Sequence, residues 1–257
     1  MNDQELLNIG VEIGKLLLVN GGEIYRVEES MQRIFAAYGV HQADVFVIPS
    51  YIHATLTNSE GASATTMRRI YTRKTHLDRV ERANDLCRRI CRDKPDLDQI
   101  RKEIEAISRM PSYSLGMECL CFALGSSAFT MFFGGSVFDA MISAVCGVVI
   151  RLILYHSLRL KGNVFFTNIV ASFMASLIAF TVALVFPGLV ADKIIIGALM
   201  TLVPGIAITS FMRDIMAGDL MAGMMRLAES LMVAAAIALG SGAALSLTHL
   251  FMGGIGA

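Results

Sequence analysis

Two arginines and three carboxylates lie close together in an otherwise apolar half of the chain. They are Arg213, Asp214, Asp219, Arg226 and Glu229. A guanidinium can hold a carboxylate through paired hydrogen bonds, and a carboxyl group in such surroundings can take up a proton. We therefore interpret the two arginines as candidate substrate-binding residues and the three acids as candidates for proton coupling.

These charges are costly if they lie in lipid. A charge at the centre of a bilayer costs about 2.5–3.5 kcal/mol on the most lenient scale, so such groups usually face one another or a polar cavity. An alternative interpretation places Arg213, Asp214 and Asp219 in an ordinary solvated loop. It fits Arg226 and Glu229 less well, because both lie within or at the edge of the last apolar segment.

A Pro-Gly pair interrupts the apolar segment just before the charges. Pro204 has no N–H to bond the carbonyl four residues earlier, so we expect the helix to kink or break there. The preceding valine cannot cap a new helix, which leaves the N–H groups of Gly205, Ile206 and Ala207 able to bind a carboxylate. Broken helices of this kind form the substrate sites of many carriers. We add these three residues and Pro204 to the candidate substrate-binding residues.

Evidence for catalytic chemistry elsewhere is thin. Two histidines and two serines in the first part of the chain suggest a hydrolase only weakly, since no nucleophile elbow or metal-binding signature accompanies them. They are His53, His76, Ser50 and Ser59. We assign them ordinary turn and surface roles.

The five cysteines predict neither a metal site nor a disulfide. Cys87 and Cys91 are four residues apart on a predicted helix, yet no second ligand pair has a suitable spacing. The other three lie in apolar segments, where cysteine packs as a small hydrophobic residue. No Walker A sequence occurs either, so we predict no bound ATP and no cofactor.

The distribution of charge divides the chain into two parts. The formal net charge is zero, but residues 1–111 carry 16 basic and 16 acidic residues, whereas residues 112–257 carry 6 of each. Because acids match the basic residues, nothing indicates nucleic-acid binding. The opening "MNDQELLNIGVEIG" has no basic region and is not typical of a secretory signal.

Five apolar segments in the second part are each near the ~20 residues that a membrane-spanning helix needs. They cover approximately residues 115–133, 137–158, 164–186, 194–212 and 227–251. Backbone polar groups find no water within a bilayer, so these segments are expected to be helical. We therefore predict an α-helical integral membrane protein whose residues 112–257 form a five-helix transmembrane domain.

Basic residues gather on one side of these predicted spans. They precede the first span, and they lie between the second and third spans and between the fourth and fifth. These residues are Arg101, Lys102, Arg109, Arg159, Lys161, Arg213 and Arg226, whereas Lys193 lies on the other side. The positive-inside rule then places the N-terminus in the cytoplasm and the C-terminus outside, in a multi-pass protein of the cell inner (cytoplasmic) membrane.

Residues 1–111 are predicted to form a small cytoplasmic α+β domain. Apolar residues recur with helical spacing over residues 4–19 and 23–38, and helical patterns return over residues 77–92 and 96–108. Between them lie two or three strand-like stretches, in "DVFVIPS", "IHATLT" and "SATTMRRI". A domain of about 110 residues can bury its own core.

Three stretches give the chain a resemblance to a known family. They are "LLLVNGGEIYRVEESMQRIFAAYGV", "TRKTHLDRVERANDL" and "LVPGIAITSFMRDIMAGDLMAGMMRLAESLMVAAAIALG". The first looks like a family motif in which a glycine-ended helix precedes Glu-x-x-Arg-Val-Glu. The last is similar to a signature of Pro-Gly, Arg-Asp, Gly-Asp and Gly-x-x-Arg. On these motifs the chain resembles the threonine/serine exporter (ThrE) family over essentially its whole length.

The resemblance implies export of small polar metabolites, driven by the proton motive force. The substrates would be threonine and serine, as in single-chain members, or a dicarboxylate such as succinate. With five predicted spans, the chain resembles the larger, YjjP-like subunit of the family's split form. That form works with a small YjjB-like membrane subunit, so the resemblance also implies a hetero-oligomer.

Three classes of function compete for these features. A secondary-active exporter explains both the interrupted helix and the charges in apolar segments. A membrane-anchored enzyme with a cytoplasmic hydrolase-like domain is the alternative, but one anchoring span would suffice for it. A scaffold would need no charges in its spans. We therefore predict a transporter subunit and no enzyme.

Overall fold

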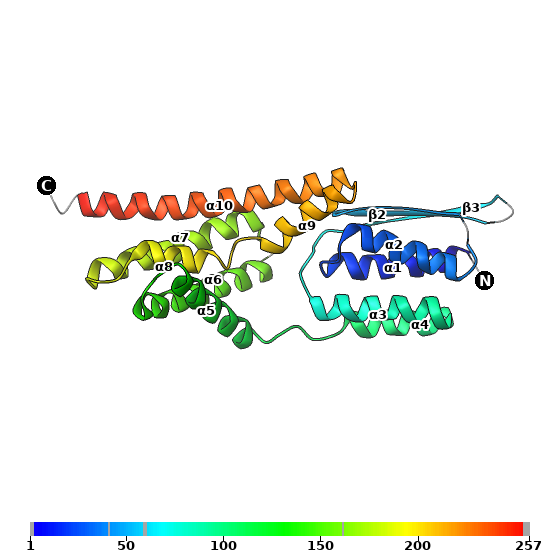
Figure 1. Ribbon diagram of the computed structural model, residues 1–257, viewed down its shortest axis with the longest axis horizontal. Coiled ribbons are helices and arrows are strands. Elements are labelled where there is room, and N and C mark those ends of the chain that lie inside the picture. The colour runs from blue at the N-terminus through cyan, green and yellow to red at the C-terminus, as the bar shows by residue number, and fades with distance from the viewer. Residues whose placement is uncertain (1–2, 41, 59–60, 161, 254–257) are drawn as a thin grey trace. The chain divides into compact units, whose positions relative to one another are not determined.

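The computed structural model describes residues 3–40, 42–58, 61–160 and 162–253, coloured along the chain in Figure 1. The protein is mostly helical, with one small sheet near the N-terminus. Its described residues form two compact units. The first comprises those of Met1–Pro111 and Ile206–Leu227, and the second those of Ser112–Gly205 and Ala228–Ala257. Ser59 and Lys161, to which the sequence assigned roles, lie outside the described residues.

Two amphipathic helices form the centre of the first unit. α1 (Asp3–Val19) and α2 (Ile24–Ala37) bury the apolar residues that recur at helical spacing, among them Leu6 and Phe35. Full burial of a side chain of this size stabilises the fold by roughly 1.5–3 kcal/mol. The two helices confirm the helical segments predicted here.

Three strands follow and form an antiparallel sheet in the order β1-β2-β3. They are β1 (Gln42–Ile48), β2 (Tyr51–Thr57) and β3 (Ser63–Arg69). In β2 every second residue is buried, and these buried residues belong to the same core as α1 and α2. The alternation explains why the β-branched stretches become strands, and it confirms strands in all three stretches.

Two further helices complete this layered arrangement. α3 (Leu77–Asp93) and α4 (Leu97–Ser108) lie on the side of α1 and α2 opposite the sheet, as Figure 1 shows. Lys94 ends α3 in the left-handed conformation, and Asp96 precedes α4. Both helices confirm predicted segments.

The first unit also contains residues from the second half of the chain. Residues 206–227 form a helical hairpin that belongs to this unit, and Ala222 is part of its hydrophobic core. The first unit thus comprises residues up to Pro111 together with this hairpin, and the second the rest of the described chain. Hydropathy alone does not reveal that the hairpin belongs to the first unit, because the hairpin is flanked by apolar segments.

Four helices in the described part of the chain are long and apolar enough to cross a membrane. They are α5 (Leu115–Phe132), α6 (Val137–Arg159), α7 (Val164–Val185) and, within α10 (Leu220–Gly253), the stretch Leu220–Leu250. α5, α6 and α7 match three of the five predicted spans closely. The last helix begins earlier than residue 227, so Arg226 lies within it.

The fourth predicted span, residues 194–212, is not one helix. α8 (Ala191–Leu199) ends before Pro204, and α9 (Gly205–Met216) begins after it. A proline within a helix removes one hydrogen bond and clashes with the preceding turn. This interruption confirms the break predicted at Pro204, and it leaves two helices too short to span a bilayer singly.

Small residues allow the helices of the second unit to approach closely. The buried face of α7 consists of Asn168, Ala171, Ser172, Ala175, Ser176 and Ala179. The hydroxyl of Ser172 donates to the Asn168 carbonyl at 2.8 Å, which satisfies this polar group within its own helix. Close approach of this kind is typical of helix packing in membranes.

Replacing Gly240 with alanine is expected to destabilise the second unit. A Cβ at this position of α10 would lie 2.3 Å from the Ile169 carbonyl oxygen and 2.0 Å from the Ser172 hydroxyl of α7. Overpacking of this kind costs about 1–3 kcal/mol, and backbone atoms cannot easily move aside. Thermal unfolding of the detergent-solubilised protein should show a lower melting temperature.

Gly242 provides a matched control two residues further along the same helix. A Cβ there meets nothing within 4 Å, so Gly242→Ala should leave stability unchanged or raise it by up to ~1 kcal/mol. Equal losses in the two variants would contradict the close packing of α10 on α7.

Candidate functional site

The helical hairpin of the first unit positions four of the five charged residues singled out above. α9 ends at Met216, and Gly218 follows with a φ of +95°, a conformation that favours glycine. The Asp219 N–H then donates to the Asp214 carbonyl at 2.9 Å, which closes the turn before α10 begins. Asp214 and Arg226 therefore come from the two arms of one tight hairpin.

Asp214 and Arg226 form a buried ion pair. The Arg226 Nε lies 3.3 Å from the Asp214 Oδ2, and their side chains are 7% and 0% exposed. Neither oxygen of the Asp214 carboxylate accepts a hydrogen bond from the described residues. A buried carboxylate without hydrogen bonds is strongly destabilised in its charged form, even beside a cation.

The surroundings of Asp214 accordingly favour its protonated form. Burial raises the pKa of the Asp214 carboxyl, and the nearby Asp219 charge raises it further. The charges of Arg226 and Arg213 act in the opposite direction without cancelling the burial. A buried carboxyl with a perturbed pKa is a candidate for a functional group.

The turn between α1 and α2 contacts both arginines of the hairpin. The Arg226 Nη2 donates to the Gly22 carbonyl at 3.3 Å, and Arg213 forms an ion pair with Glu23. The other oxygen of Glu23 lies 2.8 Å from the Nε of Arg26. Residues separated by about 200 positions in the chain thus meet in one charged network.

Glu28 adds a further carboxyl group to this network. Its Oε1 accepts a hydrogen bond from the Val47 N–H of β1 at 2.7 Å. Burial raises the pKa of Glu28, the hydrogen bond lowers it, and the charge of Asp219 raises it again. We refer to the set Glu23, Glu28, Arg213, Asp214, Asp219 and Arg226 as the charge cluster.

No pattern in the sequence indicated that Gly22, Glu23 and Glu28 lie at the candidate site. They nevertheless lie in "GGEIYRVEES", within the opening motif on which the family resemblance rests. The hairpin residues lie in the other main motif. The two motifs therefore lie side by side in the first unit. Treating the two motifs as parts of one site would have pointed to these three residues.

The remaining predicted residues lie apart from the charge cluster or belong to the second unit. Ile206 and Ala207 open α9, and Ala207 precedes Asp214 by about 10 Å along the helix. Pro204, Gly205 and Glu229 belong to the second unit. The Gly205 N–H donates to the Val203 carbonyl at 2.8 Å, so it is already bonded rather than open to a carboxylate as predicted.

The second unit holds an ion pair that the sequence did not indicate. The Arg151 Nε of α6 donates to the Glu118 Oε2 of α5 at 3.0 Å, and the Arg151 guanidinium lies 5.8 Å from the Phe122 ring. Both charged residues lie on helices long enough to span a membrane. Paired charges are the usual arrangement for ionisable groups in such helices.

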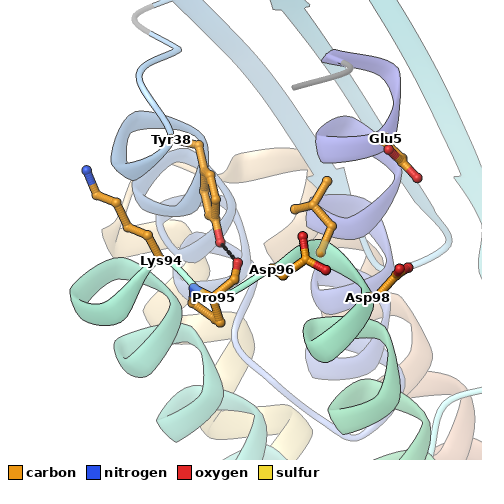
Figure 2. Close-up of a pocket in the computed structure, with 7 residues that line it drawn as sticks. Glu5, Tyr38, Lys94, Pro95, Asp96 and Asp98 are labelled. Carbon is orange, nitrogen blue, oxygen red and sulfur yellow. Dashed lines mark hydrogen bonds between the residues drawn. The ribbon is translucent and has the colours of Figure 1, made fainter.

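A small pocket in the first unit lies apart from the predicted residues. Its volume is about 390 Å³, and Figure 2 shows Glu5, Tyr38, Asp96 and Asp98 among the residues around it. The Tyr38 hydroxyl donates to the Pro95 carbonyl at 2.5 Å. Among the described residues, no group of three or more His, Cys, Asp and Glu is arranged to hold a metal ion.

Comparisons with known proteins relate the chain to one family. The family described as "Putative threonine/serine exporter" matches residues 8–248. A protein of Mycobacterium tuberculosis (strain ATCC 25618 / H37Rv), named "Probable threonine/serine exporter", is 22% identical over an alignment of 245 residues that covers 93% of this chain. The chain spans about half of that relative's length (46%).

No solved structure matches the chain. The family match covers almost all of it, including both units and the hairpin. Together with its long apolar helices, the match identifies a multi-pass membrane protein of a transport family. The chain therefore belongs to the threonine/serine exporter family.

Proposed function

We propose that the chain is one subunit of a secondary-active, proton-coupled exporter of small polar metabolites that carry a carboxylate. Threonine, serine and dicarboxylates such as succinate are the substrates we consider. Membership in the exporter family supports the direction and class of transport. The observation that carries the proposed mechanism is the buried Asp214–Arg226 pair, whose carboxylate accepts no hydrogen bond from the described residues.

Arg226, helped by Arg213, holds the substrate carboxylate in this proposal. A guanidinium matches a carboxylate in planar geometry and always keeps its charge, so its affinity for substrate does not depend on its own titration. Asp214, Asp219 or Glu229 takes the proton. Asp214 is the strongest of the three, because its burial favours the protonated form.

Proton exchange places a condition on the substrate. When proton entry drives export, the proton and the substrate occupy the site alternately. Competition between the two for the same carboxylate would produce this alternation. The ammonium group of an amino acid would compete with a proton for a carboxylate such as Asp214, whereas succinate has no cationic group. The charge cluster therefore favours an amino acid, with four carboxyl groups beside its two arginines.

The interrupted segment would supply the moving part of the transport pathway. Pro204 separates α8 from α9, and α9 leads directly into the hairpin that carries Arg213 and Asp214. Carriers commonly bind substrate at such discontinuous helices. Pro204, Gly205, Ile206 and Ala207 would then guide substrate towards the arginines.

The proposal includes a partner and an orientation. We place the first unit in the cytoplasm and the C-terminus outside the inner membrane, as the basic residues indicate. Four apolar helices are few for an alternating-access carrier, so we propose assembly with a small YjjB-like membrane subunit, in a hetero-oligomer. A transport family favours this activity over the hydrolase alternative.

Counterflow of labelled threonine and labelled succinate into proteoliposomes tests the proposed function. We expect flux only when this chain and the small subunit are reconstituted together. Asp219→Asn should lower that flux at least about tenfold, because the substitution removes a charge that faces both Asp214 and Glu28.

Asp98→Asn is the control, since it removes an exposed carboxylate of α4 outside the charge cluster. It should leave flux unchanged. Full flux from the purified single polypeptide would refute obligate assembly, and normal flux in Asp219→Asn would remove this residue from the site. Flux of succinate alone would exclude the amino-acid assignment.

A further inference from the structure

A large groove between α2 and α3 lies in the first unit and plays no part in the proposed transport site. Its volume is about 1010 Å³, compared with about 390 Å³ for the pocket of Figure 2. Ligand sites for small organic molecules usually measure about 300–1,000 Å³. The groove is thus large enough for a metabolite of nucleotide size.

Four arginines from two helices face this groove. Arg26 and Arg33 lie two helical turns apart on α2, and Arg88 and Arg92 lie one turn apart on α3. Glu29 is the one carboxylate among the groove's lining residues, all of which lie in the described part of the chain. The lining therefore carries four positive charges against one negative charge.

Three of these arginines, Arg33, Arg88 and Arg92, have exposed and weak ion pairs, whereas Arg26 pairs with Glu23, whose side chain is 17% exposed. Arg33 lies 2.5 Å from Glu29, and Arg88 lies 3.6 Å from Asp85, with every one of these side chains at least half exposed. Such surface pairs contribute about 0–1 kcal/mol. A multivalent anion can therefore replace them at little cost, while the planar guanidinium groups match phosphate oxygens in pairs.

We propose that this groove binds a small anion carrying two or more phosphate groups. The arginines of α2 and α3 hold the phosphates from opposite walls, and the Tyr25 ring at the groove offers a face for an organic group. Small and polar residues such as Ser30 and Asn84 leave room between the walls. The ligand would be an inorganic polyphosphate or a nucleoside phosphate.

One arginine of the groove also contacts the charge cluster. Arg26 lines the groove and also lies 2.8 Å from Glu23 of the cluster. Arg33 and Arg88 pair instead with Glu29 and Asp85, which lie outside the cluster, and are the residues to replace. Their substitution tests the groove without disturbing the proposed transport residues, so the two proposals fail or succeed separately.

Calorimetric titration of the detergent-solubilised full chain with pyrophosphate tests the proposal. We expect saturable binding that weakens about tenfold or more in Arg33→Gln and in Arg88→Gln. Arg82→Gln is the matched control, since Arg82 also lies on α3 and forms an exposed pair with Asp78 but does not line the groove. Unchanged melting temperatures would show that the variants remain folded.

A cysteine within the groove gives an independent readout. Cys91 is half-buried and lines the groove, whereas Cys87 is buried and its pKa is raised to about 12, chiefly by burial. Bound pyrophosphate should slow alkylation of Cys91, measured by mass spectrometry of its peptide. An unchanged alkylation rate at saturating pyrophosphate would contradict the proposal.

Titrations with other ligands define the chemical class of the groove's ligand more closely. Tighter binding of ATP than of pyrophosphate would assign a nucleoside phosphate, and equal binding an inorganic polyphosphate. Citrate binding as tight as pyrophosphate binding would overturn the phosphate assignment. Absence of saturable pyrophosphate binding, or an equal loss in Arg82→Gln, would overturn the site itself.

Discussion

Replacing Arg226 with alanine is expected to abolish export and also to destabilise the first unit. The substitution leaves Asp214 buried without its counter-ion, and breaking a buried ion pair in this way costs about 3–5 kcal/mol. It also removes the hydrogen bond to the Gly22 carbonyl, so the α1–α2 turn loses a contact with the hairpin. Counterflow and thermal unfolding should both show the loss.

The double variant Asp214→Asn with Arg226→Gln separates transport from stability. Without either charge, the hairpin no longer buries an unpaired ion, so we expect most of the lost stability to return. Export should stay absent, because neither a carboxylate-binding arginine nor a titrating acid remains. Recovery of flux along with stability would show that the pair is structural and that substrate binds elsewhere.

An exposed ion pair provides the control for the variants of the Asp214–Arg226 pair. Arg109 and Glu105 form an i,i+4 pair on the surface, with side chains 78% and 61% exposed. Replacing both with glutamine should change stability by no more than about 0.5 kcal/mol and should leave flux intact. A loss like that of Arg226→Ala would indicate a general effect of removing charge.

Much of the local structure follows from the sequence, because it depends on neighbouring residues. Helical spacing of apolar residues predicts α1 and α2, alternation predicts the three strands, and the missing N–H of Pro204 predicts the break between α8 and α9. The start of α10 at Leu220 was missed. Hydropathy places a membrane segment after the charge of Arg226, whereas helix propensity continues through the methionines before it.

The composition of the site depends on the tertiary fold and was only half predicted. The sequence identified Arg213, Asp214, Asp219 and Arg226 from their rarity in apolar surroundings. It could not identify Glu23 as the partner of Arg213, because no local sequence pattern distinguishes Glu23 from the other glutamates in residues 1–111. Only the packing of the hairpin in the first unit decides which carboxylates lie beside the arginines.

The stability of the first unit is expected to fall as pH rises through the pKa of Asp214. Burial raises the pKa of this carboxyl above its ordinary value of 3.8, so the folded protein binds the proton more tightly than the unfolded chain does. The stabilisation from this proton is fully present below the unfolded pKa. It decreases as pH rises and is lost once the folded group has deprotonated.

Asp214→Asn should remove this part of the pH dependence, because asparagine cannot titrate. Each unit of pKa shift corresponds to about 1.4 kcal/mol, so melting temperatures measured from about pH 4 to about pH 8 should diverge between the two proteins. Glu28, whose pKa is also raised by burial, contributes a slope of the same sign that Asp214→Asn retains and Glu28→Gln removes. If the melting temperatures of the wild type and Asp214→Asn change with pH in parallel, Asp214 stays charged beside Arg226 over this whole pH range. The proton would then have to bind at Asp219 or Glu229.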